Sequence, residues 1–303
     1  MGLHEMKIPS FEGWYFRFVN ELISVAVIIG IAKTKEKQEA FIQVFHTKSN
    51  QMEKAIFDIE DLQYQNKPFR IALKQNILSE DMIHLEDPRL SIALHLHIDQ
   101  AVPISKTAYA PTIMGPFAYL NHMQCNHAII NLGSQTTGTI EIENQPYLVE
   151  GIAYQENDWG TSFPSRYIWT QSNCCRDSSS VLFLSCATIP LKLISFTGII
   201  MVIKTDDQEY HFASYYGAII TERKTTEDGY SLIIKQGKYK VKCCLSMKAG
   251  YILEAPEKGL MKRTVEECLM GEATIELYRS NQCIHRLFFD HCGIENDHFF
   301  ESK

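Results

Sequence analysis

The sequence lacks any apolar run long enough to cross a bilayer as a helix. Its longest runs, Leu22–Ala32 and Leu193–Ile203, are about half of the roughly 20 residues that a spanning helix needs. The first residues also lack the basic start and apolar core of a secretory signal peptide. Met6 stands where a myristoylation signal has Ser or Thr. These absences predict a soluble, cytoplasmic chain.

Several signatures of common function classes are also missing. The 29 Lys and Arg residues are scattered and the net charge is −7, so no basic stripe points to nucleic acid. No glycine-rich phosphate loop and no Gly-x-Ser-x-Gly motif occurs. The nine cysteines include two vicinal pairs, and their spacing matches no zinc ribbon. We expect mostly buried free thiols in a reducing compartment, no cofactor and no metal.

What the sequence has in quantity is alternation of apolar and polar residues with a period of two. One face of segment 92–98 is Ile and Leu, and the other carries His95, His97 and Asp99. The segment 239–247 alternates in the same way, with lysines on one side. Such segments predict half-buried antiparallel strands. His95, His97 and Asp99 could resemble a metal site, but their position opposite an apolar face indicates that they point to water.

Turn signals separate these segments and complete an all-β pattern. They occur at Asn66–Pro68, Glu86–Pro88, Glu143–Pro146, Thr205–Asp207 and Glu227–Gly229. Closely spaced strands with turns between them are typical of antiparallel sandwiches and barrels. No long amphipathic helix stands out, and the best helix candidate, Pro256–Cys268, is ambiguous.

The two halves of the chain resemble each other faintly. Ser10–Phe16 aligns with Ser162–Ile168, and Thr139–Ile142 aligns with Thr274–Leu277. The order and spacing predict two β domains, residues 1–158 and 159–303. No linker rich in Pro, Gly or Ser divides them, so we expect the two domains to pack closely.

The most unusual stretch runs from Gly151 to Asn173. Read as strands, it places Tyr154, Glu156 and Asp158 on one face. A second set then shares a face, namely Tyr167, Trp169, Gln171 and Asn173. Aromatic rings beside amides suit an apolar pocket with a few polar anchors, because burial of unbonded amides is costly. A folding signature, in which the tryptophans pack a core and the amides bond to backbone, explains the pattern equally well.

Two further segments contain candidate site residues. Glu12 shares a face with Trp14 in an aromatic strand. Burial there should either shift the pKa of Glu12 or require an ion pair, for instance with Arg17 or Arg166. The segment Met114–His127 begins as a tight turn and continues as a strand that contains His127.

These three segments resemble the tocopherol cyclase family. Phe11–Arg17 resembles the family's opening motif, and Met114–Phe117 with Cys125 and His127 resembles a block in its bacterial members. The central motif is matched in order and spacing by Glu156, Trp159, Gly160, Phe163, Pro164, Trp169, Gln171 and Asn173. The resemblance spans nearly the whole chain. One departure is Gln124, where relatives carry Glu.

The resemblance implies two tandem lipocalin-like domains and closure of a chromanol ring on a prenylated quinol. In that reaction an acid protonates an alkene and the phenol oxygen traps the cation, so the enzyme is an intramolecular lyase of the isomerase class. The implied partner is an apolar small molecule, taken up by brief contact with a membrane. A lipocalin-like protein that binds a lipid without chemistry is the alternative.

Roles for individual residues follow from that chemistry. A carboxyl that an apolar pocket keeps protonated can serve as the acid, and aromatic faces can stabilise the cation. Glu156 is the first candidate acid, Asp158 is the second, and His127 could accept the phenolic proton. The expected substrate-binding residues are Glu12, Trp14, Tyr154, Trp159, Arg166, Tyr167, Trp169, Gln171 and Asn173.

Overall fold

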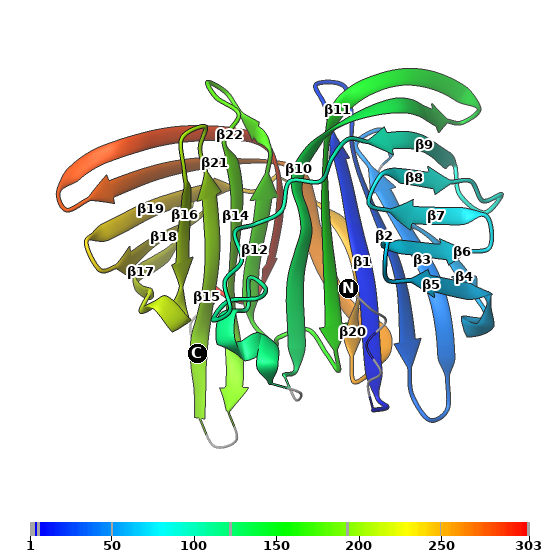
Figure 1. Cartoon of the computed structure of the whole chain (residues 1–303), viewed down its shortest axis with the longest axis horizontal. Coiled ribbons are helices and arrows are strands. Elements are labelled where there is room, and N and C mark those ends of the chain that lie inside the picture. Colours follow the sequence, from blue (N-terminus) through cyan, green and yellow to red (C-terminus); the bar gives the residue numbers. More distant parts are fainter. Residues whose placement is uncertain are drawn as a thin grey trace. The chain divides into compact units, whose positions relative to one another are not determined.

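A computed structural model describes residues 4, 7–49, 51–120, 123–191, 194–248 and 250–301. Over these residues the chain forms antiparallel strands and three short 3-10 helices, η1 (Ile59–Asp61), η2 (Gly115–Tyr119) and η3 (Ser214–Tyr216) (Figure 1). No helix in the described part is long and apolar enough to cross a membrane. The prediction of an all-β fold is confirmed.

Contacts divide the chain into two compact units. The first contains Met1–Phe163 and Leu253–Thr264, and the second contains Pro164–Ile252 and Val265–Lys303. The short segment joins the first unit through paired hydrogen bonds: the Gln43 amide donates to the Glu254 carbonyl and accepts from the Glu254 N–H, both at 3.0 Å. The sequence predicts a single division, between residues 158 and 159, because it contains no signal for the return of Leu253–Thr264 to the first unit.

The first unit is built on one sheet of 11 strands. In pairing order they are β4 (Glu53–Phe57), β3 (Gln38–His46), β2 (Ser24–Lys33), β1 (Ser10–Val19), β11 (Gln145–Gly160), β10 (Cys125–Ile142), β9 (Ile92–Ile98), β8 (Met82–Leu85), β7 (Asn76–Ser79), β6 (Arg70–Leu73) and β5 (Leu62–Gln65). Alternate residues of these strands form the core, among them Trp14, Phe16 and Phe18 of β1. The period of two in the sequence therefore selects the core-facing side of each strand.

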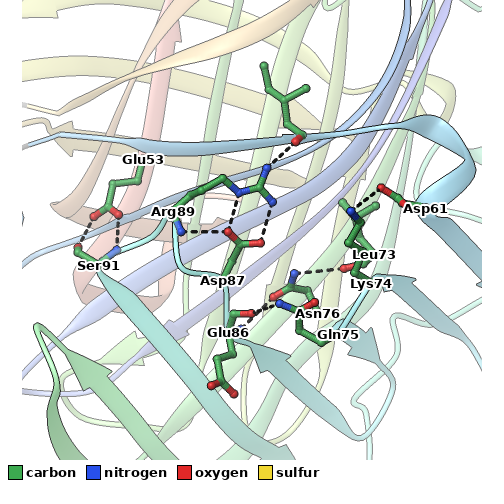
Figure 2. A network of polar contacts seen from close by, with 11 residues as sticks. Glu53, Asp61, Leu73, Lys74, Gln75, Asn76, Glu86, Asp87, Arg89 and Ser91 are labelled. Atoms are coloured by element: carbon green, nitrogen blue, oxygen red, sulfur yellow. Dashed lines mark hydrogen bonds and ion pairs between the residues drawn. The ribbon is translucent and has the colours of Figure 1, made fainter.

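A polar network joins the edge strand β4 to the loop that precedes β9 (Figure 2). Arg89 donates two bonds of 2.7 Å to the Asp87 carboxylate and one of 2.6 Å to the Ile56 carbonyl. The N–H of Ser91 donates to Glu53 at 2.5 Å. Asp87 is buried and its partner is half-exposed, so the loop is tied to β4 by a charge-assisted pair.

We expect Arg89→Ala to lower the free energy of unfolding by about 2–3 kcal/mol, because it leaves the buried Asp87 carboxylate without its partner. The bonds from Arg89 are the main reason that the pKa of Asp87 lies below its usual value. Lys74→Ala is the matched control, since the exposed Lys74–Asp61 pair at 3.1 Å should contribute less than about 1 kcal/mol. Urea unfolding of both variants measures the difference, and equal losses would contradict the assignment.

The second unit contains most strands of two further sheets. The first sheet has the order β12 (Tyr167–Ser172), β14 (Val181–Leu191), β15 (Ile194–Lys204) and β16 (Glu209–Ala213). The second sheet has the order β13 (Cys174–Cys175), β22 (Gln282–Asp297), β21 (Leu260–Arg279), β19 (Tyr239–Ser246), β18 (Gly229–Gln236) and β17 (Ile219–Thr226). β20 (Tyr251–Glu257) pairs with β21, and most of β20 and the start of β21 lie in the segment Leu253–Thr264 of the first unit. A separate apolar cluster, including Ile168, Leu232 and Ile275, forms the core of the second unit.

The two windows of internal similarity occupy equivalent places. Ser10–Phe16 opens the first unit as β1, and Tyr167 begins β12, the first strand of the second unit. Thr139–Ile142 and Thr274–Leu277 each lie in the first strand of a long hairpin, β10–β11 or β21–β22. Each unit therefore runs from an aromatic strand to a closing hairpin.

The structure confirms the turns and corrects one element. The two-residue turn Glu143–Asn144 has φ values of 49° and 64°, which suit the twist of a β-hairpin. Pro256–Cys268, the candidate helix, is instead the end of β20 and the start of β21. The segment is extended because β21 pairs with β22, with Glu267 opposite Glu295. That pairing outweighs the weak local preference.

Candidate active site

Strand β11 places Tyr154, Glu156 and Asp158 on one face, as the alternation predicts. It lies between β1 and β10 in the sheet (Figure 1). His127 of β10 is directly opposite Asp158, and Tyr15 of β1 is directly opposite Glu156. Residues directly opposite each other share a face of the sheet. The pairing thus gathers five titratable side chains from three strands that are not consecutive along the chain.

Four of these side chains contact one another, and three of the four, Tyr154, Glu156 and His127, are buried. The Nδ1 atom of His127 lies 2.7 Å from Oδ1 of Asp158, and its Nε2 atom lies 3.5 Å from Oε2 of Glu156. The hydroxyl of Tyr154 donates to the same oxygen of Glu156 at 2.5 Å. Glu156 is only 5% exposed and His127 only 9%. We call Tyr154, Glu156, Asp158 and His127 the acid cluster.

His127 is the cation of the acid cluster. Burial alone would lower its pKa, but the charges of Asp158 and Glu156 and the bond to Asp158 outweigh burial and raise the pKa to about 9. The imidazole is therefore protonated at neutral pH. A protonated ring donates hydrogen bonds from both nitrogens, which matches its position between two carboxylates.

The neighbouring phenol and thiol stay protonated. Burial, reinforced by the charge of Glu156, raises the pKa of Tyr154 well above its usual value. Burial, with Asp158 and Glu156 nearby, does the same for the Cys125 thiol. Cys125 is thus no nucleophile here, since the thiolate is the reactive form.

The acid cluster also has the residue types of a metal site. One ligand atom from each of His127, Glu156 and Asp158 lies within 4.8 Å of the others. A metal ion would bind the neutral imidazole, so it would have to displace the proton that Asp158 and Glu156 favour on His127.

Glu12, Trp14 and Trp159 lie on the opposite face of the same strands from the acid cluster. Glu12 is opposite Trp159 in the β1–β11 pair, and Trp14 is part of the hydrophobic core and stacks on Tyr64. These three side chains therefore do not share a face with Glu156. The physical reason is the period of two, which separates residues 156 and 158 from residue 159.

Glu12 is completely buried, and its partners are His4 and Asn157. The backbone N–H and Nδ1 of His4 each lie 2.9 Å from the Glu12 carboxylate, and the Asn157 amide donates to it at 3.3 Å. The ring of His4 also stacks on Trp159 with centroids 3.9 Å apart. Glu12 is thus not paired with Arg17 or Arg166, the partners considered from sequence.

The remaining expected residues belong to the second unit. Tyr167, Trp169 and Gln171 occupy alternate positions of β12 and are buried, on the face opposite the core residue Ile168. Gln171 donates to Asn173, and Trp169 packs on Gly293, where an added Cβ would lie 2.9 Å from the ring.

Arg166 forms hydrogen bonds with the backbone that follows β22. Its guanidinium donates to the carbonyls of His298, at 2.9 Å, and Glu301. These contacts give it a structural role in the second unit.

Sequence reasoning missed Tyr15 in the first unit and an acidic pair in the second. Tyr167 donates to Glu295 of β22 at 2.6 Å, as Tyr154 donates to Glu156 of β11. Glu295 begins a Glu-Asn-Asp tripeptide that repeats Glu156–Asp158 at the end of the closing strand. That repeat could have identified Glu295 from the sequence as the counterpart of Glu156. Glu267, opposite Glu295 and completely buried, had no signal in the sequence.

The fold is that of two-unit, lipocalin-like antiparallel β proteins, and in this chain it holds a cluster of two carboxylates, a histidine and a tyrosine. The family model described as "Tocopherol cyclase-like" matches residues 105–296, which is more than half of the chain. The chain belongs to the tocopherol cyclase-like family, and the resemblance found in the sequence is confirmed.

Solved structures share the fold at low sequence identity. AttH from Nitrosomonas europaea is similar with a TM-score of 0.57 and 10% identity, over 98% of this chain and 94% of that one. CghA, crystallised with Sch210972, is similar with a TM-score of 0.62 and 9% identity, over 95% and 88%. No curated protein sequence matches the chain.

Proposed function

We propose that the chain is an enzyme that closes an oxygen-containing ring on a prenylated phenol, with Glu156 as the acid. The acid cluster carries this proposal, because it holds a buried carboxyl between a hydrogen-bond donor, the Tyr154 hydroxyl, and the His127 imidazole 3.5 Å away. Membership of the tocopherol cyclase-like family supports the reaction class. Family membership alone leaves the substrate open, so the prenylated quinol is part of the proposal.

The reaction balances without an oxidant or a cofactor. Glu156 transfers its proton to one alkene carbon as the π bond breaks, and the more substituted carbon becomes a cation. The phenol oxygen then bonds to that carbon, and its proton returns to the Glu156 carboxylate. Both donors contact Oε2 of Glu156, and we assign the transferred proton to Oε1.

His127 makes Glu156 a stronger acid in this scheme. Proton transfer leaves a carboxylate on Glu156, and the imidazolium 3.5 Å away stabilises that negative charge. The reactive form is the one in which Glu156 has taken up a proton from solvent; the His127 imidazolium, the Asp158 carboxylate and the neutral Glu156 then sum to zero charge, which burial favours. His127 was first expected to accept the phenolic proton, but a ring that is already protonated cannot do so.

Two aromatic rings beside Glu156 can stabilise the cation. Tyr15 and Tyr154 share its face and lie with ring centroids 6.4 Å apart. A cation over such a ring gains about 1–2 kcal/mol in a desolvated site. The proposed substrate is an apolar phenol with an isoprenoid chain, taken up from a membrane surface. CghA supports a bound compound in this fold, since it was crystallised with Sch210972.

Deuterium labelling tests the proposed step directly. Purified protein is incubated with a methylated phytyl hydroquinone in D₂O, and the product is analysed by mass spectrometry and NMR. We expect a chromanol with one deuterium on the ring carbon next to the new C–O bonded carbon, because the acid exchanges with solvent. A chromanol without that deuterium would contradict alkene protonation. Binding without product would identify a carrier instead.

A further inference from the structure

Three histidines line the solvent-facing side of β8 and β9. The alternate residues of these strands, including Ile83, Leu94 and Leu96, face the core, so His84, His95 and His97 point away from it. The sequence alternation predicted this orientation for β9. What it could not show is that His84 of β8 is directly opposite His95 of β9.

The cross-strand pair brings two imidazole nitrogens together. Nδ1 of His84 lies 2.9 Å from Nδ1 of His95, and the ring centroids are 4.6 Å apart. The Glu86 carboxylate lies 3.8 Å from Nε2 of His84. One ligand atom from each of the three residues lies within 4.8 Å of the others.

Hydrogen bonds to neighbouring residues fix the backbone of Glu86, whereas its carboxylate takes no part in the polar network around Asp87 and Arg89. Its N–H donates to Asn76 at 2.9 Å, and its carbonyl accepts from Gln75 at 2.8 Å. Figure 2 shows these bonds, with the Glu86 side chain extending away from them. The carboxylate is 65% exposed, so it can reorient toward the histidine pair at little cost.

We propose that His84, His95 and Glu86 form a surface binding site for a divalent transition-metal ion. Imidazole and carboxylate ligands suit copper, nickel and zinc. With bonds of about 2.0–2.1 Å, two nitrogens 2.9 Å apart subtend about 90° at an ion, whereas a tetrahedral ion needs about 3.3 Å. The spacing therefore favours the tetragonal geometry of Cu²⁺ or Ni²⁺ over tetrahedral Zn²⁺.

The site is independent of the function proposed above. It differs from the triplet considered from sequence, in which His95, His97 and Asp99 alternate along one strand. His97 contacts Asp99 at 3.9 Å and is 67% exposed. It lies on the same face of the same strand as His95, which makes it a matched control.

Calorimetric titration with Ni²⁺ tests the site on untagged, full-length protein. We expect His84→Ala and His95→Ala each to weaken binding at this site by on the order of tenfold or more, and His97→Ala to leave it unchanged. All three side chains are at least partly exposed, so the variants should fold, which circular dichroism checks. Unchanged affinity in the first two variants, or an equal loss in His97→Ala, would overturn the proposal.

Copper spectroscopy gives a second readout that does not depend on affinity. The electron paramagnetic resonance spectrum of the protein with one equivalent of Cu²⁺ should show two equatorial nitrogen ligands. In His95→Ala it should show one fewer, whereas the His97→Ala spectrum should match the wild type. A spectrum that His95→Ala does not alter would count against the histidine pair as ligands.

Discussion

Glu156→Gln should lower kcat for ring closure by about 10²–10⁴-fold, because the amide cannot supply a proton to the alkene. Glutamine has nearly the same volume and can still accept the hydrogen bond from Tyr154. Substrate binding should therefore change little, and KM should stay within a few-fold of wild type. Steady-state kinetics with a prenylated hydroquinone measure both constants.

A matched control separates the acid from a general effect of charge. Glu150 lies on the same strand, β11, but is exposed, so Glu150→Gln should keep wild-type kcat. Wild-type turnover in Glu156→Gln would reject Glu156 as the acid while leaving the substrate class intact. If the wild type converts no prenylated quinol at all, the proposed substrate fails and the choice of acid stays untouched.

The free energy of unfolding should fall as the pH rises from about 7 to 8, because part of the stabilising contribution of the His127 imidazolium is lost over this range. Its pKa in the folded state is about 9, above the ordinary 6.5. A group with a raised pKa contributes stability that is complete below about 6.5 and is lost as the pH rises through about 9. The full contribution is on the order of 3 kcal/mol, with a slope of up to about 1.4 kcal/mol per pH unit.

Urea unfolding at several pH values between 7 and 8 isolates this contribution. His46 and His211 have pKa values lowered by burial, so they affect stability mainly below pH 6.5. Unfolded thiols have a pKa near 8.5 and lose some protons by pH 8, so the buried cysteines add a decline that every variant shares. His127→Gln should remove the larger part of the decline close to pH 7, and His97→Gln, at an exposed position, should preserve all of it. The same slope in His127→Gln would show that the ring is not the buried cation.

The local pattern of the sequence predicted the strands, the turns and the composition of each face. The period of two is a property of adjacent residues, so the alternation alone places Tyr154, Glu156 and Asp158 together. The same alternation places Trp159 on the opposite face, so Trp159 cannot line a pocket together with Glu156 on this strand. The turn at Glu143–Asn144 is equally local, and it was predicted correctly.

Only the tertiary structure decided which strands meet and in what register. His127 faces Asp158, Tyr15 faces Glu156, and His84 faces His95 because of pairings between distant segments. A shift of one residue in any of these pairs would move the side chains to the other face. The return of Leu253–Thr264 to the first unit is likewise a long-range contact. The sequence by itself determined which side chains each strand carries on its two faces. The tertiary structure decided which side chains of neighbouring strands lie next to them, because strand register depends on the packing of the whole sheet.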